Sequence, residues 1–277
     1  MKNKNDKKPR MRPSKVLAKL RAGEVVNCFK INLDSSRVAE IAALAGFDCI
    51  WTCMEHVPND YALIERQINA AKCYDTDVLV RVPRGSYSDY IRPLELDASG
   101  IMVPHIMSAE DARNVARMTR FHPIGRRPVD GGNADGQYCR IDYCDYLKQA
   151  NEQRFVIIQI EDPEPLEELD EIAQVKGIDM LFFGPGDFSQ GIGAPGQWDH
   201  PRLTEARKMV AQAAVKHGKF AGTMGAPEKI KDLTAMGYQF INFGSDVTTV
   251  GGYCRSVLEE IAGITSSFKS KSIYGDK

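Results

Sequence analysis

Short apolar segments alternate with helical patterns along this 277-residue chain, and this rhythm restricts its fold more than any other feature. The segments are rich in Val, Ile and Phe without clean polar alternation, which is typical of strands buried on both faces. The predicted strands are residues 25–33, 47–53, 77–82, 100–104, 155–160, 178–183, 220–224 and 239–244. The predicted helices that follow them are residues 35–47, 59–74, 87–96, 108–121, 163–175, 201–218, 227–238 and 246–264.

Eight strand–helix units predict an α/β protein, a single closed (β/α)₈ TIM barrel. A doubly wound open sheet is the alternative. The barrel is favoured because the chain contains all eight strand–helix units that a TIM barrel requires. We expect the barrel domain to cover residues 15–265, between a basic N-terminal arm at 1–14 and a flexible tail at 266–277. The arm is expected to be disordered or to form a surface strap. The glycine-rich interruption at 121–146 is typical of a functional lid or an interface arm.

Charge and cysteine content exclude several classes of function. The formal net charge of −1 provides no general attraction to nucleic acid or an anionic membrane. No apolar run is long enough to cross a bilayer, and the N-terminus lacks the apolar core of a secretory signal. The seven cysteines are odd in number and without CxxC spacing, which predicts reduced thiols in a cytoplasmic protein.

Polar residues follow several predicted strands, where a barrel carries its chemistry. Glu161 and Asp187 end neighbouring strands, and two close carboxylates repel unless a proton or cation lies between them. Such a pair suits Mg²⁺ or Mn²⁺. A helix cap at Glu161 and a turn at Asp187 are the alternative roles.

Four basic residues are further candidates. Arg81 interrupts an apolar strand and requires an anion, either a substrate carboxylate or an internal partner. His56 ends a strand and is a candidate acid/base group or a hydrogen-bonded rim residue. The other four histidines show no ligand spacing, and His105, after the fourth strand, is the best of them. Lys30 could form a Schiff base, but the absence of lysine from the sixth strand disfavours that route.

Five motifs occur in one order along residues 14–265. They are AGFDCIWTCMEHVPND, VLVRVP, LDASGIMVPHIMSAEDARNVARMTRFHPIGRRPV, VIIQIE and MLFFGPGDFSQGIGAPGQWDHP. Together they resemble the HpcH/HpaI aldolase family of class II pyruvate aldolases. The last motif is the most specific, with its GPxD-[LF]-S turn followed by G-x-P-G and D-H-P.

The resemblance implies a barrel of the phosphoenolpyruvate/pyruvate-binding type and a carbon–carbon lyase. The implied reaction cleaves a 2-keto-4-hydroxy acid to pyruvate and an aldehyde through a pyruvate enolate. The resemblance also implies a divalent cation (Mg²⁺, Mn²⁺ or Co²⁺) held by Glu161 and Asp187. The implied assembly is a homohexamer, a trimer of dimers that exchange the last helix.

The resemblance assigns further residues to substrate binding and catalysis. Arg81 and Gln159 would contact the pyruvate unit. The backbone N–H groups of Gly186 and Asp187 would receive its carboxylate, and Met224 would line the pocket.

His56 would be the acid/base group. Asp97 matches an aspartate that the family pairs with this histidine. Asp97 precedes the fourth strand, so a neighbouring subunit would have to supply it.

Several positions depart from the family pattern. Cys53 replaces the first acid of a D-x-E-H motif, Met54 replaces a small residue, and the first strand carries Lys30 and its neighbours without the family's frequent tryptophan. These departures leave two alternatives: another lyase, such as an oxaloacetate decarboxylase or a phosphoenolpyruvate-type lyase, and a non-catalytic metabolite-binding barrel.

Overall fold

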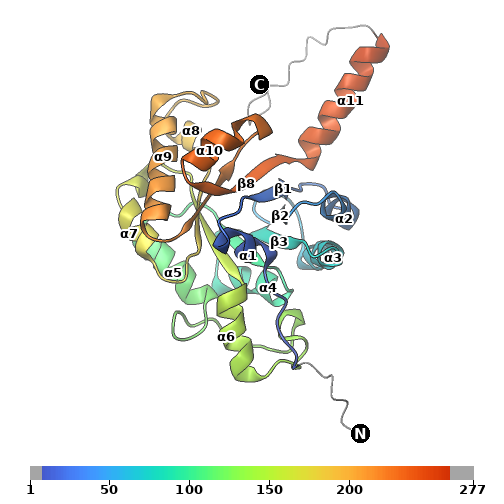
Figure 1. Ribbon diagram of the computed structural model, residues 1–277, viewed down its shortest axis with the longest axis vertical. Helices are drawn as coiled ribbons and strands as arrows, with labels where there is room; N and C mark the ends of the chain where they lie inside the picture. Colours follow the sequence, from blue (N-terminus) through green and yellow to red (C-terminus); the bar gives the residue numbers. More distant parts are fainter. Residues whose placement is uncertain (1–7, 263–277) are drawn as a thin grey trace.

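Eight parallel strands close into a barrel in the order β1 to β8, and β8 pairs with β1 to complete the ring (Figure 1). The computed structural model describes residues 8–262. The strands are β1 (Val26–Lys30), β2 (Cys49–Cys53), β3 (Asp77–Arg81), β4 (Gly100–Val103), β5 (Phe155–Ile160), β6 (Met180–Phe183), β7 (Phe220–Met224) and β8 (Tyr238–Ser245). The predicted TIM barrel is therefore confirmed.

Helices surround this ring and connect its strands (Figure 1). The α-helices are α1 (Lys15–Arg21), α2 (Ser36–Leu44), α3 (Tyr61–Lys72), α4 (Tyr87–Glu95), α5 (Ala109–Thr119), α6 (Tyr143–Gln153), α7 (Leu169–Gln174), α8 (Pro185–Gly191), α9 (Pro201–Lys216), α10 (Ile230–Ala235) and α11 (Asp246–Ala262). Single 3₁₀ turns are η1 (Ala134–Gly136), η2 (Glu164–Leu166) and η3 (Pro227–Lys229). The eight predicted helices are present, whereas α1, α6 and α8 were not predicted.

The barrel interior is filled by large apolar side chains. Alternate strand residues face inward, and Trp51, Phe182 and Phe240 belong to one buried cluster there. Three residues of α1 pack into the same cluster, Val16, Leu17 and Leu20. Helix α1 therefore closes the N-terminal end of the barrel, and the remaining opening lies at the C-terminal ends of the strands.

The segment before α1 is held against that closed end. Met11 is buried, Arg12 Nη1 lies 2.8 Å from Asp77 Oδ1, and Ser14 Oγ donates to Asp77 Oδ2 over 2.6 Å. Ser14 also caps α1 through the Leu17 N–H. Residues 11–14 thus form the strap rather than the disordered arm, while residues 1–7 and the tail at 266–277 lie outside the described residues.

The 121–146 interruption lies at the closed end as well, because it follows the C-terminus of α5. Phe121, Ile141 and Tyr146 form a small core with Met11, and buried Arg127 lies 3.0 Å from Asp135. The prediction of a lid was wrong, because a segment at this end cannot cover the open mouth. The prediction of an interface arm stays a prediction.

Helix α11 projects away from the barrel (Figure 1). Its exposed apolar side chains include Tyr253, Leu258 and Ile261, the last 78% exposed. Among residues 8–262, no helix combines the length and apolar character needed to span a membrane.

Candidate active site

Glu161 is the buried acid at the open mouth of the barrel. It follows β5 directly and is 2% exposed. Its Oε2 accepts a hydrogen bond from Gln159 Nε2 over 2.8 Å, and its Oε1 accepts one from the His105 backbone N–H over 2.9 Å. Burial raises the pKa of Glu161 to about 7, against the opposing effects of the His105 hydrogen bond and the Arg81 charge.

Asp187 comes to this acid from the neighbouring strand connection. It lies in the first turn of α8, and its side chain is exposed. The residue before α8, Gly184, allows the two connections to approach, because a Cβ there would lie 2.6 Å from Glu161 Oε2. The convergence of Glu161 and Asp187 expected from the sequence is present.

His105 completes a cluster with these two acids. One ligand atom each from His105, Glu161 and Asp187 lie within 4.8 Å of one another. An imidazole and two carboxylates, one of them with an elevated pKa, fit a divalent cation. These three groups therefore form a candidate site for a divalent cation.

The placement of His105 depends on its backbone and its neighbours. Its φ of 49° is in the left-handed region, which turns the chain sharply after β4. Ring Nδ1 lies 2.8 Å from Asp162 Oδ2, and Nε2 lies 3.8 Å from both Glu55 Oε1 and Glu161 Oε1. Although burial lowers the pKa of His105, the Asp162 hydrogen bond and the Glu161 charge produce a net rise. The sequence signalled this histidine only by its position after a strand.

Arg81 ends β3 inside the mouth and is 4% exposed. Its Nε lies 3.0 Å from Glu55 Oε2, and both Nε and Nη2 donate to Cys53 Sγ over 3.3 Å. Its guanidinium carbon lies 5.1 Å from the centroid of the Trp51 ring. The substituted Cys53 is therefore a direct neighbour of the guanidinium, and so is Glu55, the acid of the strand-two motif, to which the sequence assigned no role.

The remaining predicted site residues occupy different depths. Gln159 is 2% exposed and its Oε1 has no hydrogen-bond partner, whereas the His56 side chain is 58% exposed, with Nε2 3.6 Å from Glu55 Oε2. Gly186 lies in the first turn of α8, where a Cβ would meet nothing within 4 Å. Met224 ends β7 and packs, partly buried, on the interior cluster.

Asp97 lies at the other end of the barrel. It precedes β4, with one carboxylate oxygen 2.5 Å from Arg154 Nη2 and the other 3.2 Å from Lys72 Nζ. Within this chain the structure does not bring Asp97 to His56. Supply of Asp97 by a neighbouring subunit stays a prediction, and within its own chain Asp97 already has cationic partners.

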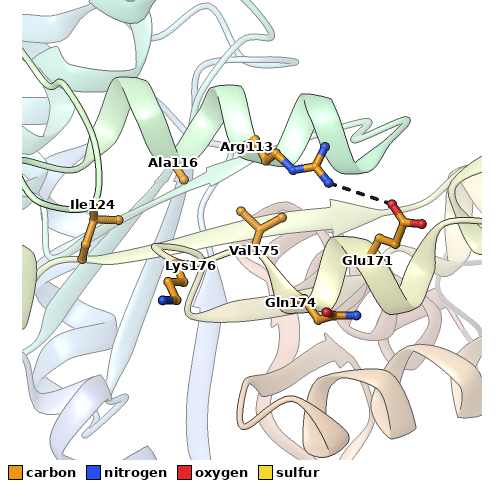
Figure 2. Close-up of a pocket in the computed structure, with 7 residues that line it drawn as sticks. All are labelled: Arg113, Ala116, Ile124, Glu171, Gln174, Val175 and Lys176. Atoms are coloured by element: carbon orange, nitrogen blue, oxygen red, sulfur yellow. Dashed lines mark ion pairs between the residues drawn. The ribbon is translucent and has the colours of Figure 1, made fainter.

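A hollow of about 530 Å³ lies on the outer surface between α5 and α7 (Figure 2). Arg113 Nη2 lies 3.9 Å from Glu171 Oε2 across it, and Ala116 and Lys176 lie along its edge. These residues come from the outer layer and not from strand ends, so the hollow is separate from the acid cluster.

A closed eight-stranded barrel with a histidine, a buried acid and an exposed acid clustered at its C-terminal mouth defines a barrel enzyme with a candidate cation site. A model of the HpcH/HpaI aldolase/citrate lyase family matches residues 28–251. The chain belongs to this family, and its enzyme class is that of the aldolases, which are carbon–carbon lyases.

Similar proteins cover nearly the whole barrel. The chain is 32% identical over 257 residues to a 2-keto-3-deoxy-L-rhamnonate aldolase of Salmonella gallinarum, covering 92% of this chain and 96% of that protein. A Shigella sonnei protein of the same name is 33% identical over 230 residues, covering 82% and 85%. Two solved structures are also similar: an HpcH/HpaI aldolase from Desulfitobacterium hafniense DCB-2 (TM-score 0.85, 29% identity, 92% and 98% covered) and the citrate synthase SbnG (TM-score 0.82, 27% identity, 91% and 98% covered).

Proposed function

We propose that this enzyme cleaves a 2-keto-4-hydroxy acid into pyruvate and an aldehyde. The observation that carries the proposal is the cluster of His105, Glu161 and Asp187 next to the buried Arg81. The similarity to 2-keto-3-deoxy-L-rhamnonate aldolases supports a 2-keto-3-deoxy sugar acid as the substrate class.

Glu161 and Asp187 would hold the divalent cation, with His105 as a third group within reach. A bound Mg²⁺, Mn²⁺ or Co²⁺ would supply Lewis acidity toward the oxygens of a keto acid. The ionised form of Glu161 is the form that binds a cation, so a cation would replace the proton that burial favours there.

The protein groups orient the keto acid and stabilise the charge that develops on it. Arg81 would stabilise the oxygen that becomes negative when the C3–C4 bond breaks, and Gln159 would contact the same pyruvate unit. The backbone N–H groups of Gly186 and Asp187, in the first turn of α8, would receive the carboxylate. Met224 would line the apolar side of the pocket.

The reaction requires a group that removes the proton of the 4-hydroxyl, and His56 is the candidate. His56 would accept the proton of the 4-hydroxyl group as the aldehyde forms, and its exposure at the mouth allows exchange with water. The pyruvate enolate then takes a proton at C3. His105 is the second imidazole at the mouth, and comparing His56→Asn with His105→Asn distinguishes their roles.

The test is a pyruvate-release assay over 2-keto-4-hydroxy acids, after chelation and with each cation added back. We expect no release after chelation and restored release with Mg²⁺, Mn²⁺ or Co²⁺. Arg81→Ala should lower the rate about 10²–10³-fold, as expected when one electrostatic partner of the transition state is removed. Activity that survives thorough chelation, or normal turnover by the Arg81 variant, would contradict the proposal.

We also propose a cytoplasmic homo-oligomer, a hexamer built as a trimer of dimers, in which α11 packs on a neighbouring subunit. The free cysteines support the compartment, and the exposed apolar residues of α11 support the assembly. Light scattering should show that Leu258→Glu with Ile261→Glu lowers the molar mass, whereas Glu260→Gln on the same helix leaves it unchanged. An unchanged mass for the double variant would remove α11 from the interface.

A further inference from the structure

Cys53 is a buried thiol at the mouth of the barrel, and the proposed chemistry gives it no part. It ends β2, pairs in register with Arg81 on β3, and is fully buried. It continues the inward row of β2, in which Cys49 and Trp51 belong to the interior cluster. The Cys53 sulfur therefore lies between the apolar interior and the mouth, on the side formed by β2 and β3.

Three N–H groups converge on this sulfur. Nε and Nη2 of Arg81 each donate to Cys53 Sγ over 3.3 Å, and the backbone N–H of His56 donates to it over 3.4 Å. Sulfur is a weak acceptor, but a hydrogen bond from an ionised donor is stronger than one between neutral groups. One side chain thus contacts the arginine proposed to stabilise the enolate and the segment that carries the proposed proton acceptor.

The sulfur gives the guanidinium a direction that its carboxylate neighbour does not. Glu55 Oε2 lies 3.0 Å from Arg81 Nε, yet this oxygen forms no hydrogen bond. Glu55 therefore supplies charge, which attracts without fixing an orientation, whereas the two hydrogen bonds to Cys53 fix one edge of the planar group. That edge consists of Nε and Nη2, which leaves Nη1 for an oxygen of the keto acid.

The same sulfur closes the turn that follows β2. It accepts the N–H of the residue three positions later, while Asn59 Nδ2 donates to the Cys53 carbonyl over 2.8 Å. The His56 side chain is 58% exposed, so its position depends mainly on the backbone of this turn. A change at Cys53 should therefore reach both Arg81 and His56.

We propose that Cys53 is a positioning residue, whose sulfur orients the Arg81 guanidinium toward the keto acid and holds the turn that carries His56. This inference rests on the proposed function and adds a residue that acts through Arg81. The thiol takes no part in making or breaking bonds. It sets the geometry in which negative charge develops beside Arg81, where a small displacement lowers the rate.

The test follows the exchange of the C3 protons of pyruvate in deuterium oxide by mass spectrometry, with Mg²⁺, Mn²⁺ or Co²⁺ added. Exchange requires the enolate but no aldehyde, so it reports on Arg81 without the second product. Cys53→Ala should lower kcat for exchange about tenfold, the size expected for a hydrogen bond to a charged group. Cys53→Ser keeps an acceptor near the same place and should stay within about threefold of wild type.

The matched control is Cys49→Ala, which removes a fully buried thiol from the same row of β2. Urea unfolding should show similar losses of stability in the two alanine variants, because each leaves a cavity of the same chemistry. Exchange by Cys49→Ala should stay within about twofold of wild type, because stability and activity at separate sites are independent.

Arg81→Lys tests whether the sulfur acts through the guanidinium. Lysine keeps the positive charge but lacks the planar fork, so the sulfur has no edge to orient. Cys53→Ala should therefore lower exchange less than about twofold in the Arg81→Lys background, since residues that act as one unit are not additive.

Several results would overturn the inference. They are wild-type exchange by Cys53→Ala, equal losses in the two alanine variants, a serine variant as slow as the alanine variant, and full additivity with Arg81→Lys. A wild type that neither exchanges the protons of pyruvate nor releases pyruvate from any 2-keto-4-hydroxy acid would reject the proposed function as well, so the two failures are distinct.

Discussion

Glu161 makes the stability of the cation-free protein depend on pH. Its folded-state pKa of about 7 lies above the ordinary 4.5, so between these values the folded state binds more protons than the unfolded state. Stability should therefore fall as the pH rises from about 4.5 through 7, by about 3 kcal/mol in total. Urea unfolding of the chelated protein at several pH values measures this slope.

The matched variant is Glu161→Gln, which should remove the slope near pH 7. A divalent cation should stabilise the wild type more at pH 8 than at pH 6, because protons compete for the same oxygens. A slope that persists in the variant would assign the titration to another group.

Some site residues could be predicted from the sequence, and others depend on contacts that the sequence does not reveal. Glu161 and Asp187 could be predicted to meet, since neighbouring parallel strands deliver their C-terminal residues to one rim. His105 could not be placed, because its contacts depend on a left-handed turn after β4 and on Asp162 from another strand connection. The shared contact of Lys30 and Arg81 with the Trp51 ring depends on how three strands bring these side chains together, which no local pattern records.

At the scale of elements, the β6–α8 connection shapes the candidate cation site. Gly184→Ala would place a Cβ 2.6 Å from Glu161 Oε2 and 2.7 Å from its Cβ. We expect this variant to lower cation affinity at least tenfold while the barrel still folds, because the acid must shift. Isothermal titration measures the affinity, and Gly131→Ala is the control, since a Cβ there meets only a Tyr146 ring carbon at 4.0 Å. Equal affinities in the two variants would show that the approach of β6 to Glu161 is not critical.

The elements that were predicted share a strong periodic pattern. Strands β2 to β6 are buried at every position, and β1, β7 and β8 are largely buried, so apolar segments marked all eight in the sequence. Strand β1 spans Val26–Lys30 and not the predicted 25–33. Helix α1 was missed because it precedes the first strand–helix unit. Helix α8 is a single short segment with two glycines, so its helical character depends on the tight β6 connection. Helix α6 was not predicted because it directly follows the irregular 121–142 segment and has no strand before it.

For the whole molecule, the buried contacts of Asp77 and the candidate active site lie at opposite ends of the barrel. Asp77 is fully buried at the closed end, where it accepts hydrogen bonds from Arg12, Ser14 and Ser99. Asp77→Ala should lower the free energy of unfolding by about 3–5 kcal/mol, because Arg12 loses its nearest carboxylate and the buried donors of Ser14, Val16 and Ser99 lose their acceptor.

Urea unfolding measures that loss, and Asp232→Ala on the exposed face of α10 is the control, expected within about 0.5 kcal/mol of wild type. Below the unfolding transition the Asp77 variant should keep the wild-type KM. A changed KM with unchanged stability would contradict the separation of the two ends.

The filled interior, closed by α1 at its N-terminal end, leaves the barrel open only at the C-terminal ends of its strands. In the proposed reaction both products would leave by the route through which the substrate entered, and the keto acid end would lie beside the buried Glu161, while His56 is exposed. Departure should accordingly be sequential, with the aldehyde first and pyruvate last. Product inhibition would record that order: pyruvate competitive with the substrate, the aldehyde noncompetitive.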